Sequence, residues 1–250
     1  MTEHVLISRE GAILTIRLNR PEKKNALTRA MYHAMADGLR QAAADDGVHV
    51  VLLAGGQDFT AGNDIGDFAK AGDRDPKDPG AAFDFLEAII GFGKPVIAAV
   101  RGNAVGIGTT MLLHCDVVVT SESARLMMPF TRLALCPEAG SSLLMPARVG
   151  PARANWWLLA SAGFSGAEAA EAGLATRSVP DNEVEPMALQ MATTLAALPT
   201  GSVQESKRLI RAPHAAAVAA AMAAERVTFG ERLRSAEAQA AFAGFLKKAG

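Results

Sequence analysis

Three segments of the sequence contain residue types that could do chemistry. Two of them are glycine-containing turns, Phe59–Asp64 (FTAGND) and Ala99–Gly108 (AVRGNAVGIG), and the third, Leu135–Ser142 (LCPEAGSS), contains a single carboxylate. Glycine-rich turns can present backbone N–H groups to an anion or to a developing oxyanion, and a carboxylate can accept and return a proton. Together these groups would suit proton transfer next to a carbonyl.

The segment Ala99–Gly108 reads as an apolar strand that enters a glycine-rich turn and then a helix. The glycines permit backbone angles that other residues avoid, and the first N–H groups of a helix lack intrahelical partners and lie at its positive end. An ordinary strand-to-helix turn that needs glycine for close packing remains an alternative. A dinucleotide fingerprint fits poorly because Met111 stands where its third glycine should be.

The turn Phe59–Asp64 is weak evidence alone, because Asn63 and Asp64 could simply cap the next segment. Together with the Ala99–Gly108 turn it is stronger evidence for a site. Both turns follow strands that we expect to be parallel, so both lie on the side where α/β sheets bind ligands. Two converging N–H groups are what an acyl-transfer or enolate-forming site needs.

Glu138 lies just ahead of a helix predicted over Ser141–Arg148. A carboxylate at this place can serve only as a cap that compensates the helix dipole. In the functional interpretation it is a general base, with Phe130, Leu133 and Leu135 supplying apolar surroundings. Partial desolvation would then raise its pKa toward a useful range.

The hydrophobic pattern predicts the elements that must position these groups. Val5–Ser8 and Ile13–Leu18 form a hairpin, Thr28 caps a helix over Arg29–Asp45, and apolar runs indicate parallel strands buried on both faces. The later elements are strands at Val48–Leu53, Val96–Val100 and Asp116–Thr120, an extended piece at Ala124–Met128, and helices at Ala81–Ile90, Ile107–His114, Asp181–Leu198, Ser202–Arg211, His214–Arg234 and Ala236–Lys248.

Composition excludes several function classes. The 250 residues are 50% hydrophobic and carry 25 basic and 26 acidic side chains, so the basic excess of a nucleic-acid binder is absent. No apolar run approaches the ~18 residues of a membrane span, and the N-terminus MTEHVLISRE lacks the pattern of a signal peptide. Cys115 and Cys136 read as buried free thiols of a reducing compartment. We therefore expect a cytoplasmic protein that binds neither nucleic acid nor membrane.

His114, Cys115 and Asp116 superficially suggest a metal cluster. Consecutive residues point in different directions on a helix or strand, and metal ligands usually follow longer defined spacings. A structural role is therefore the preferred interpretation.

In their order and spacing, the three chemistry-bearing segments resemble the crotonase (enoyl-CoA hydratase/isomerase) superfamily over nearly the whole chain. The resemblance is strongest to Δ3,Δ2-enoyl-CoA isomerases of the peroxisomal type, which have a similar SGND turn, AVGI turn and PEG-x-SS segment. It implies an α/β fold, a crotonase-like spiral of repeated ββα units with a helical C-terminal region. Residues 1–180 would form the core with the acyl-CoA site, and 181–250 a helical region that assembles a homotrimer or a dimer of trimers.

The resemblance also implies the roles of the site residues. The backbone N–H groups of Asn63 and Ile107 would form an oxyanion hole for the thioester oxygen, with Glu138 as the base. Enoyl-CoA hydratases use two glutamates to hold and activate water, and the matching positions here are Thr110 and Phe130. Neither can act as a general base, so a site with one carboxylate favours proton shuttling over hydration.

For the substrate, the resemblance implies one set of CoA contacts and one acyl pocket. The CoA contacts would be Lys23, Lys24, Ala26, Ala61, Asp64 and Ile65, and the acyl pocket would contain Phe68, Phe130 and Leu135. Lys207, Phe245, Lys247 and Lys248 match positions near the CoA tail with weaker specificity. No metal or redox cofactor is expected, since CoA arrives as part of the substrate.

The predicted function is therefore conversion of a 3-enoyl-CoA to a 2-enoyl-CoA. Two alternatives stay open within the superfamily, a hydratase and another acyl-CoA isomerase or lyase. A third is a non-catalytic, RNA-binding member, against which the balanced charge and the complete oxyanion-and-base set both argue.

Overall fold

The computed structural model describes residues 2–64, 66 and 80–249, with side chains described up to residue 244. Its centre is a six-stranded sheet in the order β1-β2-β3-β4-β6-β9. The first two strands pair antiparallel and the other neighbours pair parallel. The strands are β1 Val5–Glu10, β2 Ile13–Leu18, β3 Val50–Ala54, β4 Val96–Val100, β6 Val117–Ser121 and β9 Arg177–Val179.

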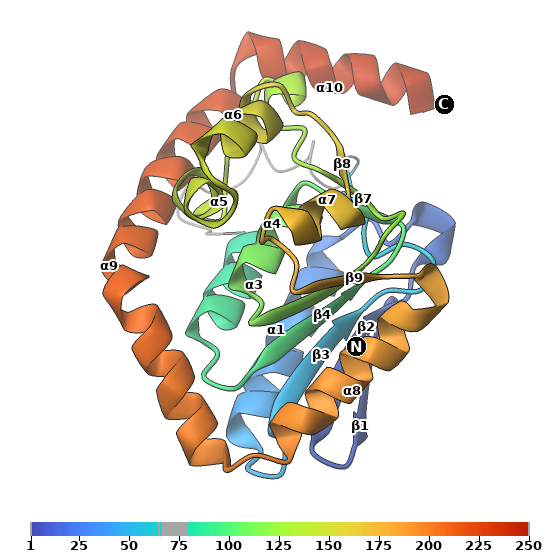
Figure 1. Ribbon diagram of the computed structural model, residues 1–250. Helices are drawn as coiled ribbons and strands as arrows, with labels where there is room; N and C mark the ends of the chain where they lie inside the picture. The colour runs from blue at the N-terminus through green and yellow to red at the C-terminus, as the bar shows by residue number, and fades with distance from the viewer. Residues whose placement is uncertain (1, 65, 67–79, 250) are drawn as a thin grey trace.

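A second sheet consists of three short strands in the order β5 Asn103–Val105, β7 Arg125–Met127 and β8 Phe164–Ser165. The main sheet is covered on both faces (Figure 1). Val51 and Leu53 of β3 pack into the core beneath α1 (Arg29–Ala44) and α3 (Ala81–Gly91), whereas Val50 and Leu52 pack against α8 (Val184–Ala196). This two-sided burial is why β3 reads as a continuous apolar run.

Several predicted elements are confirmed. The hairpin forms with Val5 opposite Leu18, and Thr28 caps α1 by accepting a hydrogen bond from the Met31 amide at 3.3 Å. The predicted helix at Ile107–His114 is shorter than expected, because α4 (Ile107–Thr110) continues as a 3-10 turn, η3 (Met111–His114). The remaining elements are α5 Ser141–Val149, α6 Pro151–Leu159, α7 Gly166–Glu171, α10 Ala236–Ala249, and the 3-10 turns η1 Pro21–Lys23, η4 Thr131–Leu133 and η5 Asp181–Glu183.

One expectation about the C-terminal helices is wrong. The helices predicted at Ser202–Arg211 and His214–Arg234 are a single helix, α9 (Thr200–Leu233), which passes through Pro213 and runs along the outside of the molecule (Figure 1). Proline removes the hydrogen bond to the carbonyl four residues earlier. That carbonyl belongs to Leu209, a residue that is 61% exposed. Contacts on both sides of Pro213, at Arg211 and Glu225, hold the helix against the body.

None of the helices within these described residues is long and apolar enough to cross a membrane.

Candidate active site

The two glycine turns pack directly against each other. Thr60 and Ala104 form a bridge, with the Thr60 amide donating to the Asn103 carbonyl at 2.8 Å and the Val105 amide to the Thr60 carbonyl at 3.0 Å. Gly62 has φ +88°, and a Cβ there would lie 2.7 Å from the Val105 carbonyl oxygen. Glycine is required at 62 by both the backbone angle and the close approach.

Each turn leaves one backbone amide available to donate a hydrogen bond into the site. Leu27 donates to the Gly62 carbonyl and accepts from the Asp64 amide, so in this parallel bridge the intervening Asn63 N–H points away from Leu27. Ile107 is the first residue of α4, where an amide has no intrahelical partner. Neither amide has an acceptor among the described residues, and both residues line one cavity of about 620 Å³.

Asn63 is held in place by its side chain. The buried Tyr32 hydroxyl, on α1, donates to Asn63 Oδ1 at 2.6 Å. Burial, and secondarily the charge of Glu138, raises the pKa of Tyr32 well above its usual value, so this hydroxyl keeps its proton and remains a donor. The contact therefore fixes the turn that presents the Asn63 amide.

Glu138 lies in the same cavity. It is followed by two residues with left-handed backbone, Ala139 at φ +60° and Gly140 at φ +71°, before α5 begins at Ser141. Such a conformation costs a non-glycine residue such as Ala139 about 1–2 kcal/mol. This tight turn separates Glu138 from the helix, so its carboxyl does not cap α5.

Thr110, on α4, donates its hydroxyl to Glu138 Oε1 at 2.5 Å. The pKa of Glu138 is raised from 4.5 to about 7, chiefly because burial disfavours the charged form. The Thr110 hydrogen bond lowers the pKa, and the negative charge of Glu225 raises it. A carboxyl with a pKa near neutrality is present in both protonation states at physiological pH, as a group that takes and returns a proton must be.

The rest of the cavity is mostly apolar. Phe130 and Leu135, both predicted for the acyl pocket, line it. The C-terminal helices add Phe229 from α9 and Phe242 from α10, which sequence reasoning missed. Their apolar residues at helical spacing indicated buried faces, but nothing local showed which surface they would cover. Phe68 and Ile65 lie outside the described residues.

The predicted CoA contacts gather beside the Phe59–Asp64 turn. Ala61 lines the cavity, and its amide donates to the Lys24 carbonyl at 2.8 Å, which places the exposed side chains of Lys23 and Lys24 next to the site. Arg20 bridges this loop and the turn. It donates to the Ala26 carbonyl at 2.9 Å and forms an ion pair with Asp64 at 2.7 Å.

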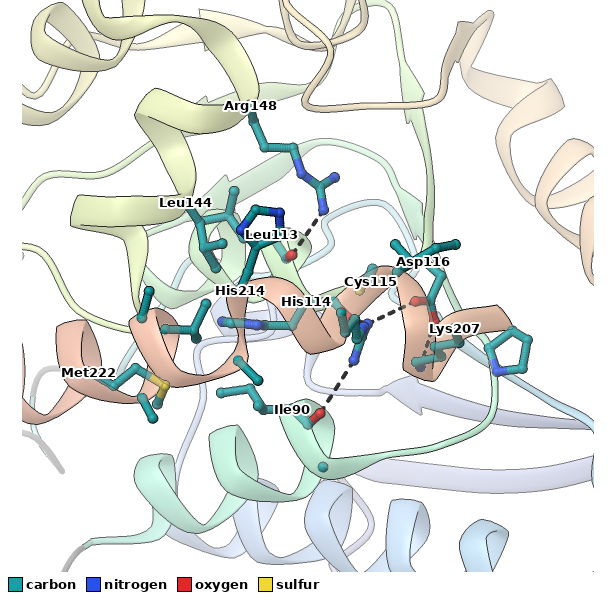
Figure 2. A pocket seen from close by; sticks show the side chains of 18 of the residues that line it. Ile90, Leu113, His114, Cys115, Asp116, Leu144, Arg148, Lys207, His214 and Met222 are labelled. Carbon is teal, nitrogen blue, oxygen red and sulfur yellow. Dashed lines mark hydrogen bonds and ion pairs between the residues drawn. The ribbon is translucent and has the colours of Figure 1, made fainter. Parts of the chain in front are cut away.

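Lys207 is not available to a CoA tail. Only 7% of it is exposed, and its ammonium donates to the Lys94 carbonyl at 2.6 Å and to Asp116 at 2.7 Å. Figure 2 shows Lys207 on its helix turned toward Asp116. Burial is also the main reason why the pKa of Lys207 is lowered to about 8. The side chains of Phe245, Lys247 and Lys248 lie outside the described part of the chain.

Comparisons with known proteins agree on one family. The model of the enoyl-CoA hydratase/isomerase family matches residues 8–250. Enoyl-CoA delta isomerase 2 of Rattus norvegicus is 37% identical over 211 residues, which are 83% of this chain but only 54% of that protein. The probable enoyl-CoA hydratase of Rhodobacter capsulatus is 34% identical and covers 94% of this chain and 92% of its own. The structure of OdaA from Pseudomonas aeruginosa superposes with a TM-score of 0.94 at 46% identity, covering 98% of this chain and 99% of its own.

Proposed function

The chain belongs to the enoyl-CoA hydratase/isomerase family, with the α/β crotonase fold and helical C-terminal region that the resemblance predicted, and we propose that it shifts the double bond of a 3-enoyl-CoA to give the 2-enoyl-CoA. The proposal rests on one cavity that is lined by Glu138 and by Asn63 and Ile107, whose backbone amides have no acceptor among the described residues. Glu138 is the one carboxylate among the described residues that line it.

In this mechanism Glu138 removes a proton from C2, which the thioester makes acidic. The electron pair moves onto the thioester oxygen and gives a dienolate, whose negative oxygen accepts hydrogen bonds from the Asn63 and Ile107 amides. Preorganised donors of this kind stabilise the transition state by about 3–4 kcal/mol each. Protonated Glu138 then delivers the same proton to C4, and the double bond forms between C2 and C3. Proton and electrons balance without a further reactant.

Hydration is the second candidate, favoured by the similarity to the probable enoyl-CoA hydratase of Rhodobacter capsulatus. Phe130 argues against it. Its ring lines the cavity at the position where the resemblance puts a water-binding glutamate, and only 5% of the residue is exposed. An apolar ring there offers no hydrogen bond to an attacking water.

The test is to incubate the purified protein separately with a 3-enoyl-CoA and a 2-enoyl-CoA and to identify the products by mass spectrometry. We expect the 3-enoyl-CoA to be converted to an isomer of equal mass and the 2-enoyl-CoA to gain no water. Glu138→Gln should lower kcat by at least about 10³-fold while acyl-CoA binding is retained. Glu231→Gln, an exposed change of the same chemistry on α9, is the matched control. Full turnover by Glu138→Gln would end the proposal.

The CoA nucleotide would lie along the loop of Lys23 and Lys24. Both ammonium groups are exposed beside Ala61 at the cavity wall, and neither has an ion pair among the described residues. An exposed cation can contact a phosphate of CoA. Replacing both lysines with alanine should raise KM for acyl-CoA and leave kcat within about twofold, because the lost interaction is the same in ground and transition states.

Assembly would use residues 181–250. A groove of about 1490 Å³ lies between α9 and the body of the molecule, and Figure 2 shows Ile90, Leu144 and Met222 among its walls. On α9, Ile210 is 74% exposed and Val227 64% exposed. Apolar surface of this kind favours contact with further copies of the chain. Light scattering coupled to gel filtration should give a mass of three or six chains.

A further inference from the structure

The peptide unit between Ala139 and Gly140, one residue beyond Glu138, is held at both ends. His114, on η3, contacts the Ala139 carbonyl through Nε2 at 2.8 Å, and the Gly140 amide donates to Glu225 Oε2 at 2.6 Å. These two groups belong to one planar peptide and point in opposite directions. Holding both therefore fixes the orientation of the peptide, and with it the backbone from which the Glu138 side chain projects.

The two hydrogen bonds on the Ala139–Gly140 peptide hold a backbone conformation that would otherwise be unfavourable. Ala139 and Gly140 are consecutive residues in the left-handed region, a conformation that persists only where the surroundings impose it. Glu225 lies on α9, 85 residues along the chain from Gly140, and is 7% exposed. Its other oxygen accepts from the amide and the hydroxyl of Ser142, so three donors surround the carboxylate.

The hydrogen bond between His114 and the Ala139 carbonyl has a fixed donor and acceptor. A carbonyl oxygen can only accept, so His114 Nε2 carries the hydrogen. Burial is the main reason why the pKa of His114 is lowered to about 4, and the ring therefore stays neutral over the pH range in which the base works. The neutral ring is therefore a fixed hydrogen-bond donor to the Ala139 carbonyl.

We propose that His114 and Glu225 are positioning residues that clamp the Ala139–Gly140 peptide and thereby aim the Glu138 carboxyl into the cavity. The proposal rests on the proposed function in that it takes Glu138 as the base. The proposal makes helix α9 part of the active site, because Glu225 reaches the Gly140 amide only when α9 is packed against the body of the molecule. A simple cap on α5 would stabilise the fold but would not control the turn that carries the base.

Because Glu225 is charged, its proposed role can be tested through the pH dependence of kcat. The groups that interact with Glu138 come from several elements: the Thr110 hydroxyl from α4, the Tyr32 hydroxyl from α1, the Cys136 thiol from its own segment, and Glu225 from α9. Arg132 from η4 also lines the cavity. Of these, Glu225 raises the pKa of Glu138 by charge repulsion. Neutralising it should therefore move the acid limb of the kcat profile to lower pH.

The experiment compares two variants of Glu225. Glu225→Gln should lower kcat about tenfold or more with KM within about twofold, because a small displacement of a catalytic group is costly, and it should shift the acid limb to lower pH. Glu225→Asp keeps the charge but shortens the reach, so kcat should fall while the acid limb stays in place. Glu231→Gln, exposed on the same helix, is the control and should behave as wild type.

Hydrogen–deuterium exchange of residues 138–142, followed by mass spectrometry, tests the clamp without turnover. We expect faster exchange at Gly140 and Ser142 in both Glu225 variants. If Glu225→Gln does not fold, Glu225→Asp and His114→Gln provide the kcat and exchange readouts. Wild-type kcat and pH profile in a folded Glu225 variant, or unchanged exchange in this segment, would overturn the clamp. Wild-type protein that does not turn over 3-enoyl-CoA would overturn the proposed function, while the exchange result would still decide whether the peptide is clamped.

Discussion

Replacing Thr110 with valine should move the pH dependence of turnover upward. Thr110 is fully buried, and its hydroxyl donates to Glu138 Oε1, so valine removes the donor with little change of shape. A hydrogen bond to a charged group contributes about 1.5–3 kcal/mol. It stabilises the ionised form of Glu138 more than the protonated form and so lowers the pKa.

The magnitude follows from that energy. One pKa unit corresponds to about 1.4 kcal/mol, so the lower figure for the lost bond predicts a rise of about one unit. Glu138 begins with a pKa of about 7. At pH 7 the ionised fraction would fall from about a half to about a tenth, and kcat would fall about fivefold. At pH 9 and above most of the carboxyl would be ionised in both proteins, and kcat should recover to near the wild-type value.

The assay is the kcat profile between about pH 5.5 and 9.5 with a 3-enoyl-CoA at saturating concentration. Thr110→Ser keeps the hydroxyl and should follow the wild-type curve, which separates the lost donor from any repacking. An acid limb that stays in place in Thr110→Val, or that moves to lower pH, would refute the electrostatic role given to Thr110. A kcat reduced equally at every pH would show that valine displaces Glu138 rather than changing its pKa.

Three further changes test other parts of the structure. The pKa of Glu138 in the folded state lies above its ordinary value of 4.5, so the folded state loses stability as pH rises from about 4.5 to 7. Glu138→Gln does not titrate, so in urea unfolding at pH 8 its free energy of unfolding should exceed that of wild type by up to about 3 kcal/mol, with no difference near pH 4. Gly62→Ala should lower both Tm and kcat, the latter more than about tenfold, since the new Cβ would lie 2.7 Å from the Val105 carbonyl and push the two amide turns apart; unchanged kcat would contradict the shared oxyanion site. Lys207→Met removes the buried donor to the Lys94 carbonyl, while Asp116 keeps its ion pair with Arg211, and should cost about 1–3 kcal/mol in urea unfolding, while kcat of the folded protein stays at the wild-type level.

The local sequence pattern was sufficient to predict those elements whose structure depends on neighbouring residues alone. The hairpin of β1 and β2, the Thr28 cap and the buried strand β3 were all predicted, because side-chain period, capping and turn chemistry act over a few residues. The same holds for the two glycine turns, where Gly62 marks a backbone angle that other residues avoid. Their mutual contact was an expectation from the fold family, and the structure describes it atom by atom.

What the sequence by itself determined is therefore the type of each element and the residues that bear chemistry. The tertiary structure decided which of those residues meet. No local rule showed that α9 would continue through Pro213, that Phe229 and Phe242 would close the cavity, or that Glu225 would reach the turn behind Glu138. Each depends on contacts between segments far apart in the chain, and so does the pKa of Glu138, which is set by burial and by neighbours from α4 and α9. A carboxyl acquires the proton affinity of a base only when the folded chain removes it from water.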